Sequence, residues 1–303
     1  MAHYVKDECP VCKHEKYRIF GKVREESPPL PVPEGSAIVA CHHCKLIYVN
    51  PMPHWDKDDF SKLYNESYFL HLNDHAQTKW LALREKLIPQ RRFERIEPHL
   101  QSDKKKLLEI GAGEFAFMCR HLAAKDWDVT AQEPSALFAD KLNNIKGLKV
   151  TEADLLDLKG EGEYSLIFAD SVLEHVPNPV QVYQKLAGLL APGGVLYTVS
   201  PNEYSAYNFM LNFIAKRKKT TPHFIAPYTQ PYHLTGFTKR ALDILAHESG
   251  LILLNYRKID DFMAFHALHS NRPALRKYPL SFLYAASQAV GFGTNGEALF
   301  VKR

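Results

Sequence analysis

The sequence predicts an α/β protein, with a doubly wound, mostly parallel sheet of seven strands preceded by a small cysteine-rich N-terminal domain. Two observations predict the sheet. After residue 105, short apolar runs alternate with segments of helical periodicity, and a glycine turn follows the first apolar run. A third observation, two Cys-x-x-Cys pairs before residue 50, predicts the small domain.

The composition sets broad limits on function. The chain has 303 residues, of which 46% are hydrophobic and 24% charged, and its formal net charge is +4. This charge is far from that of a polybasic nucleic-acid-binding protein, so we do not expect nucleic acid as a partner. No apolar stretch reaches about 18 residues, and the N-terminus lacks the apolar core of a signal peptide. We therefore expect no membrane span and a cytoplasmic location.

Residues 1–50 form the first predicted unit, a zinc-ribbon-like domain. The pairs Cys9–Cys12 and Cys41–Cys44 each place two thiolates two residues apart, so that both can reach one ion at about 2.3 Å. Two such turns complete a tetrahedral Zn²⁺ site with no open position, which predicts a structural metal. Two alternatives stay open on the residues alone: four unligated cysteines, or a histidine of the second knuckle (His42 or His43) as a ligand.

Two further units follow. Residues 51–105 read as an aromatic and helical connector that also covers the ligand site, and Pro89 is expected to kink or end its helix. Residues 106–303 form the sheet domain, with strands predicted at 106–110, 128–132, 148–151, 164–169, 195–200, 252–257 and 298–302. Helices are predicted at 114–124, 135–143, 179–190 and 238–249. An aromatic-rich insertion at 258–296 is open to three interpretations: a lid, a substrate wall or a homodimer surface.

The run from Leu107 to Gly113 is the most informative local feature. A buried strand carries one acid, Glu109, and ends in two glycines, whose lack of a Cβ atom allows a tight turn and close approach of a ligand. A strand, a glycine turn and a helix N-terminus together form a site for a nucleotide-like ligand. The run from Gly111 to Ala116 matches G-x-G-x-x-A, so a dinucleotide and S-adenosylmethionine are both candidates at this point.

Downstream motifs separate these two ligands. Glu133 closes the second strand, Asp154 follows the third, the fourth runs into Asp170-Ser-Val-Leu-Glu-His175-Val, and Ala-Pro-Gly-Gly precedes the fifth as an expected tight turn. With these motifs in order, residues 106 to about 257 resemble the class I S-adenosylmethionine-dependent methyltransferases. The cysteine pairs followed by residues 46–51 and 64–69 also resemble zinc-ribbon methyltransferases of small-molecule and surface-sugar pathways, although we expect no counterpart of the extra C-terminal domain of the deoxysugar C-methyltransferases.

The resemblance implies a Rossmann-like fold with an antiparallel last strand, S-adenosylmethionine as cofactor, and a set of site residues. The glycines would lie under the methionine part of the cofactor, Glu133 would hold the ribose, and Asp154 would face adenine. Phe115 departs from the small residue that the family often has there. The cofactor-binding residues implied are Glu109, Gly111, Gly113, Glu133, Asp154, Leu155, Asp170 and Ser171. Tyr68 joins them because an aromatic face near a sulfonium is a cation–π partner, with packing between the ribbon and the main domain as its alternative role.

The acceptor side is less specific. A base is needed only if the nucleophile carries a proton, and histidine titrates near working pH. His175 is therefore the first catalytic candidate, with backbone hydrogen bonding as its alternative role. His233 and Tyr204 are added because they follow the fifth strand, where the resembled family builds its acceptor pocket, and loop packing is the alternative role of Tyr204.

We expect methyl transfer by direct displacement to a small-molecule acceptor, with a sugar or sugar nucleotide as the class that the resemblance suggests. One alternative is an RNA or protein methyltransferase that uses the ribbon for recognition, which the modest net charge argues against. The other is a non-catalytic interaction protein that retains the fold, which the intact acids Glu133 and Asp154 argue against.

Overall fold

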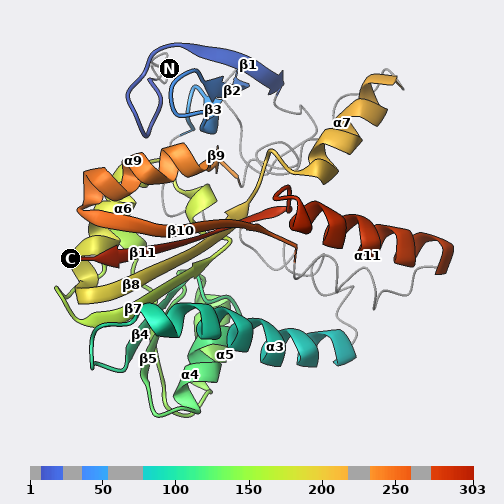
Figure 1. Ribbon diagram of the computed structural model, residues 1–303. Coiled ribbons are helices and arrows are strands. Elements are labelled where there is room, and N and C mark those ends of the chain that lie inside the picture. Colours follow the sequence, from blue (N-terminus) through green and yellow to red (C-terminus); the bar gives the residue numbers. More distant parts are fainter. Residues whose placement is uncertain (1–7, 23–35, 54–77, 218–232, 261–273) are drawn as a thin grey trace.

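The structure is a computed structural model that describes residues 8–22, 36–53, 78–217, 233–260 and 274–303. Two sheets organise these residues (Figure 1): one of seven strands in the order β10-β11-β8-β7-β4-β5-β6, and one of four strands in the order β1-β2-β3-β9. Across the described residues, no helix is long and apolar enough to cross a membrane.

The seven-stranded sheet confirms the predicted fold class. Its strands β6, β5, β4, β7 and β8 pair in parallel, and β11 inserts antiparallel between β8 and β10. Their bounds are β4 (Lys106–Ile110), β5 (Asp128–Gln132), β6 (Leu148–Thr151), β7 (Tyr164–Asp170), β8 (Leu190–Pro201), β10 (Leu251–Ile259) and β11 (Asn295–Lys302). Each of the seven predicted strands is present, and the first three have the predicted bounds.

The predicted turn before the fifth parallel strand is instead a bulge inside β8. Tyr164 of β7 lies opposite Leu190, whereas Leu166 lies opposite Val195, so β8 carries the additional residues. Gly193 has a φ of +71°, and a Cβ atom on Gly194 would come within 2.9 Å of the Tyr164 carbonyl oxygen. The Pro-Gly-Gly sequence therefore bends the strand where the backbones approach most closely, and the strand begins earlier than predicted.

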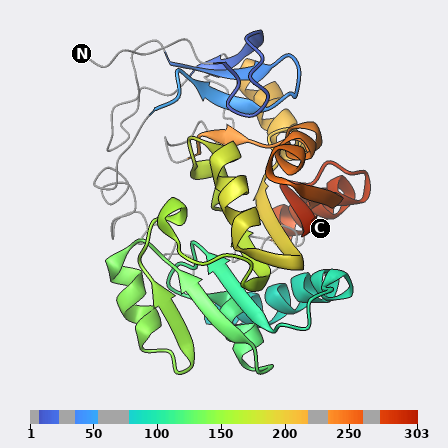
Figure 2. The same cartoon turned by 90° about the vertical axis from the view of Figure 1, so that its left-hand side faces the viewer.

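The helices cover both faces of this sheet. Leu107 packs with α3 (Thr78–Ile96) and α4 (Phe117–Ala123), whereas its neighbour Leu108 joins the cluster that contains α6 (Pro179–Leu189) and α9 (Lys239–Ser249). This alternation is the period of two expected for a strand buried on both faces. Figures 1 and 2 show the two helical layers on opposite sides of the sheet. The remaining helices are α5 (Ala136–Asn143), α7 (Ala206–Arg217), α11 (Ala274–Ala289), η1 (Glu97–His99), η2 (Leu155–Asp157) and η3 (Leu173–His175).

Helices α5, α6 and α9 match their predicted bounds to within one residue, whereas α4 and α3 depart further from the prediction. Helix α4 begins three residues after the predicted start, because Ala116 has a left-handed conformation (φ 43°) that ends the glycine turn. Helix α3 continues through Pro89, so the expectation that this proline could end the helix is wrong. Beyond Pro89, Arg92 and Arg95 fasten the C-terminal half of α3 to the sheet by ion pairs, and this tertiary packing outweighs the local helix-breaking preference.

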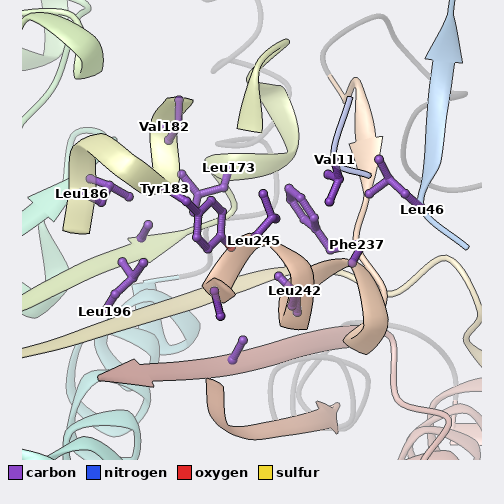
Figure 3. Packing of buried hydrophobic residues seen from close by; sticks show 14 of the residues in the cluster. Val11, Leu46, Leu173, Val182, Tyr183, Leu186, Leu196, Phe237, Leu242 and Leu245 are labelled. Atoms are coloured by element: carbon purple, nitrogen blue, oxygen red, sulfur yellow. The ribbon is translucent and has the colours of Figure 1, made fainter. Parts of the chain in front are cut away.

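The cysteine-bearing segment is joined to the main sheet domain. Strands β1 (Tyr17–Lys22), β2 (Ala37–Cys41) and β3 (Ile47–Asn50) pair antiparallel, and β3 also pairs with β9 (Thr235–Gly236), which lies just before α9. Figure 3 shows Val11 and Leu46 beside Phe237 and Leu242, and all four belong to one buried cluster. The segment therefore shares a core with the α6 and α9 layer, and its position relative to the sheet is set by that packing.

Candidate active site and cysteine cluster

The glycine turn after β4 is built from two glycines with different surroundings. Gly111 and Gly113 have φ values of +60° and +59°, which favour glycine. A Cβ atom on Gly111 would lie 2.6 Å from Cγ2 of Val172, whereas one on Gly113 would meet nothing within 4 Å. Gly111 is thus needed for packing against the segment after β7, and Gly113 faces open space where a ligand can approach the backbone.

Glu133 and Gln132 hold this turn from the end of β5. The backbone N–H of Gly113 donates to Oε2 of Glu133 at 2.8 Å, and that of Ser135 donates to Oε1 at 2.9 Å. Burial raises the pKa of Glu133, and these two hydrogen bonds oppose the rise. Each carboxylate oxygen can accept a further hydrogen bond, so Glu133 supports the turn and still has acceptor capacity toward a ligand.

Gln132 is a site residue that the sequence reasoning missed. Its Oε1 accepts from the Gly111 backbone N–H at 3.0 Å, and its Nε2 donates to the Ala153 carbonyl at 3.0 Å. It therefore ties the ends of β4, β5 and β6 together. Asp154 and Leu155 follow Ala153 in the chain, and both are half-buried. The Asp154 carbonyl accepts from the Asp157 backbone N–H and so caps the short helix η2. The sequence signal that could have identified Gln132 was a polar residue at the end of an otherwise apolar strand.

Glu109 lies in β4, just before the glycine turn. Its carboxylate accepts from the backbone N–H groups of Met118 at 3.3 Å and Cys119 at 2.7 Å, so it anchors the first turn of α4 to β4. Burial raises the pKa of Glu109 to about 7, although the hydrogen bonds from Cys119 and Met118 lower it. Glu109 therefore acts on the helix that follows the glycine turn.

Asp170 is held by an arginine from a distant helix. Nη1 of Arg92 in α3 lies 2.5 Å from Oδ2 of Asp170, and the Ser171 hydroxyl donates to Oδ1 at 3.2 Å. The Arg92 guanidinium also lies 5.7 Å from the ring centroid of Phe168. A cavity of about 220 Å³ lies here, with Arg92, Glu109, Met118, Phe168, Asp170 and Ser171 among its lining residues. No motif or spacing in the sequence indicated that Arg92 would lie at this cavity.

The two candidate histidines meet beside a buried glutamate. His175 in η3 and His233 just before β9 have ring centroids 4.5 Å apart, at an interplanar angle of 66°. Glu174 is 0% exposed, and burial first, then the charges of Asp170 and Glu203, raises its pKa to about 8. Burial also lowers the pKa of His233 well below its usual value, with His175 adding to the effect.

The structure places the other candidates elsewhere. The Tyr204 hydroxyl donates to the Lys45 carbonyl at 3.3 Å, and its ring packs against Phe20 at 5.9 Å, so this tyrosine contacts the cysteine-bearing segment. Tyr68 lies outside the described residues. Phe115 stacks on Phe117 with ring centroids 5.1 Å apart, beside the glycine turn.

A second, larger cavity of about 630 Å³ lies between the cysteine-bearing segment and the main domain. None of the described residues that line it is acidic, and five are cationic: Arg18, Lys45, Lys239, Arg240 and Lys258. Tyr204 and Tyr256 add aromatic surface. Because these residues come from both ends of the chain, sequence reasoning did not identify this basic groove.

The four predicted metal-ligating cysteines form one cluster. Sγ of Cys9 lies 3.5 Å from Sγ of Cys44, and that of Cys12 lies 3.5 Å from that of Cys41. All four sulfurs lie within 4.8 Å of one another, and none is bridged by a disulfide. Four thiolates at about 2.3 Å from a tetrahedral Zn²⁺ would be about 3.8 Å apart, so the cluster fits zinc.

The two knuckles have the same backbone geometry. Lys13 N–H donates to the Cys9 carbonyl, Lys45 N–H donates to the Cys41 carbonyl, and both lysines have positive φ values (57° and 63°). The His43 backbone N–H donates to Sγ of Cys41 at 3.3 Å, which favours a thiolate. The group of close ligand atoms contains no nitrogen of His42 or His43, so the geometry favours the four-thiolate alternative.

The fold and the site together define a class of protein. A mostly parallel sheet with an antiparallel strand beside β8, a glycine turn after the central strand, and acids after the next two strands describe a class I S-adenosylmethionine-dependent methyltransferase domain. The family model described as "Methyltransferase domain" matches residues 74–255, more than half of the chain. The protein belongs to this family.

Curated relatives match only in part. The tRNA U34 carboxymethyltransferase of Pseudoalteromonas atlantica is 26% identical over 129 residues, which cover 40% of this chain and 38% of that protein. A ubiquinone biosynthesis O-methyltransferase of Saccharophagus degradans is 27% identical over 158 residues, which cover 48% of this chain and 66% of that protein. The chain thus spans less than two thirds of the length of either relative.

Solved structures agree on the fold. A SAM-dependent methyltransferase from Archaeoglobus fulgidus has a TM-score of 0.53 at 13% identity, covering 78% of this chain and 100% of that one. The 1,6-didemethyltoxoflavin-N1-methyltransferase of Burkholderia thailandensis has a TM-score of 0.51 at 10% identity, covering 90% and 98%. At these identities the similarity concerns the fold alone.

Proposed function

We propose that the protein transfers the methyl group of S-adenosylmethionine to a small-molecule acceptor. The observation that carries the proposal is the open space in front of Gly113, in a turn whose backbone is held by Glu133. In this assignment the methionine part of the cofactor lies over Gly111 and Gly113, and Glu133 accepts hydrogen bonds from the ribose hydroxyls. Asp154 and Leu155 lie beside adenine, and Glu109 keeps α4 in place.

The chemistry is a direct displacement. A lone pair of the acceptor attacks the methyl carbon while the C–S bond breaks and its electron pair stays on sulfur, which leaves S-adenosylhomocysteine. Because the sulfonium is a good leaving group, the protein chiefly aligns the two reactants and excludes water. We place the methyl group near Asp170 and Ser171, and the reacting atom of the acceptor on the side of His175 and His233. Tyr68 is retained as a proposed cofactor contact and Tyr204 as a proposed wall of the acceptor site.

The basic groove supports an acceptor that carries phosphate, such as a sugar nucleotide. Its volume of about 630 Å³ suits a small molecule, and its five cationic side chains favour an anion. Arg18 and Lys45 come from the cysteine-bearing segment, so this segment would shape the acceptor site while its zinc remains structural. The domain limits at 50 and 105 are retained as part of this proposal.

Cofactor binding tests the site assignment. We expect isothermal titration calorimetry to give micromolar affinity for S-adenosylmethionine, and Glu133→Ala to weaken it at least about ten-fold, since it removes acceptors for the ribose and support for the turn. The matched control is Asp140→Ala, an exposed acid on α5. Equal affinity in wild type and Glu133→Ala would reject the assignment.

Transfer of labelled methyl tests the acceptor class. We expect label in sugar nucleotides, little in the unphosphorylated sugars, and a raised KM in Arg18→Ala and Arg240→Ala. Label found in RNA, together with binding that weakens steeply with salt, would support the polymer alternative instead.

A further inference from the structure

Glu174 is a buried carboxylate without a partner. Its side chain is fully buried, and among the described residues neither carboxylate oxygen has a hydrogen-bond partner. An ionised carboxylate in such a place is costly, and a protonated one would still hold an O–H donor without an acceptor. The backbone around it is fixed, because Leu234 N–H donates to the Glu174 carbonyl at 2.8 Å. A group other than the described residues would satisfy this side chain.

Two histidines complete a ligand set around this carboxylate. The ligand atoms of Glu174, His175 and His233 all lie within 4.8 Å of one another, and His175 Nε2 lies 4.0 Å from Oε1 of Glu174. Metal–ligand bonds of about 2.0–2.2 Å place neighbouring ligands about 3–3.5 Å apart, so the widest separation must shorten by at most about 1–2 Å, which side-chain rotation can supply. Two histidines and one carboxylate form a recurrent site for divalent transition metals that leaves positions open.

The neighbouring acidic side chains also suit a cation. Asp170 and Glu203 both interact electrostatically with Glu174, and Glu203 is likewise buried, with neither oxygen partnered among the described side chains. Arg92 pairs with Asp170, but it does not contact Glu174 in the described contacts. The site thus holds two buried acidic side chains without a hydrogen-bond partner among the described residues, and a bound divalent cation would favour their ionised forms.

We propose that Glu174, His175 and His233 bind one divalent metal ion, separate from the zinc of the cysteine cluster, and that this ion holds a hydroxyl group of the methyl acceptor. Glu174 and His175 lie within five residues of Asp170 at the carboxyl end of β7, and His233 joins them from the segment just before β9. A divalent cation lowers the pKa of a bound hydroxyl, whose proton leaves to solvent. The resulting oxyanion attacks the methyl carbon, and the C–S electron pair stays on sulfur. The acceptor role rests on the proposed methyl transfer, whereas metal binding does not.

Mn²⁺ is the probe, because it prefers oxygen and nitrogen ligands and leaves the thiolate cluster to zinc. We titrate Mn²⁺ into the zinc-loaded full-length chain by calorimetry and by electron paramagnetic resonance. We expect one Mn²⁺ per chain and a rise in Tm on binding. Glu174→Gln and His233→Ala each weaken binding at least about ten-fold. His247→Ala, which removes a histidine whose side chain is 88% exposed, leaves binding unchanged.

The outcomes separate this proposal from the proposed function. Absence of Mn²⁺ binding, or equal binding in Glu174→Gln and wild type, overturns the metal site even if S-adenosylmethionine binds and methyl is transferred. Mn²⁺ binding without affinity for S-adenosylmethionine rejects the methyl transfer and keeps the metal site. Glu174→Gln preserves side-chain shape, so circular dichroism and unchanged S-adenosylmethionine affinity verify its fold; if His233→Ala unfolds, His175→Gln replaces it.

Discussion

At the scale of single residues, four buried glutamates fall into two pairs that differ in their hydrogen bonding. Glu109 and Glu133 each accept two backbone N–H groups, so they hold α4 and the glycine turn in position. Glu174 and Glu203 are equally buried, but their carboxylates have no partner among the described residues. Because an unsatisfied buried carboxylate lowers stability, this second pair indicates a function other than support.

Glu109 leads to a pH prediction. Its pKa in the folded state is about 7 against a usual value of 4.5, so between these values the folded protein binds the extra proton. Stability therefore declines as the pH rises through this window, by up to about 3 kcal/mol from this group. In Glu109→Gln we expect that decline to be absent, so the variant gains relative to wild type between about pH 5 and about pH 8 in denaturant unfolding. A difference that is constant with pH would contradict this prediction.

At the scale of elements, helix α3 is the main departure from local prediction. Its C-terminal half continues past Pro89 because Arg92 and Arg95 reach Asp170 and Glu297 on the sheet. The same contacts make α3 a wall of the cavity beside Asp170. The Arg92–Asp170 ion pair thus both holds α3 on the sheet and shapes this cavity.

We expect Arg92→Ala to destabilise the protein by about 2 kcal/mol, since it leaves Asp170 without its charged partner, and to weaken S-adenosylmethionine binding. The value is moderate because the Asp170 side chain is 31% exposed and water screens it. Denaturant unfolding and calorimetry measure the two effects. Arg91→Ala, an exposed neighbour on the same helix, serves as control and should change neither.

At the scale of the whole molecule, the cysteine cluster is continuous with the main core. Cys9 and Cys44 belong to the same buried cluster as Phe237 and Phe300, and β3 pairs with β9 across the boundary. A hydrogen bond from Cys44 lowers the pKa of Cys9 to about 5, whereas burial raises the pKa of Cys12 to about 11, so the four thiols share their protons as one group.

Removal of zinc should therefore affect the entire chain. We expect elemental analysis to show one Zn²⁺ per chain in wild type and none in Cys44→Ser, and the variant to unfold at a lower temperature in a single transition. Cys119→Ala, which alters the core near α4, should keep the zinc. Two separate unfolding transitions in the wild type would show that the segment folds independently.

The homodimer through residues 258–296 stays a prediction. Within that region, α11 exposes Leu275 (91%) and Phe282 (75%), and on α7, which packs against α11, Phe209 is 77% exposed. Apolar surface of this kind suits a second copy of the chain. We expect light scattering to give twice the monomer mass of 34.6 kDa. Phe282→Glu should give the monomer, and a monomeric wild type would reject the dimer.

The sequence alone determined the features that depend on neighbouring residues: seven strands in order, the glycine turn, the acids after β5 and β6, and the paired cysteines. These follow from backbone sterics, hydrophobic periodicity and ligand spacing, which act over a few residues. Only the tertiary structure decided the Arg92–Asp170 ion pair, the approach of His233 to Glu174 and His175, the basic groove and the β3–β9 pairing. Each joins residues far apart in the chain, so each depends on how whole surfaces pack, and no local pattern contains that information.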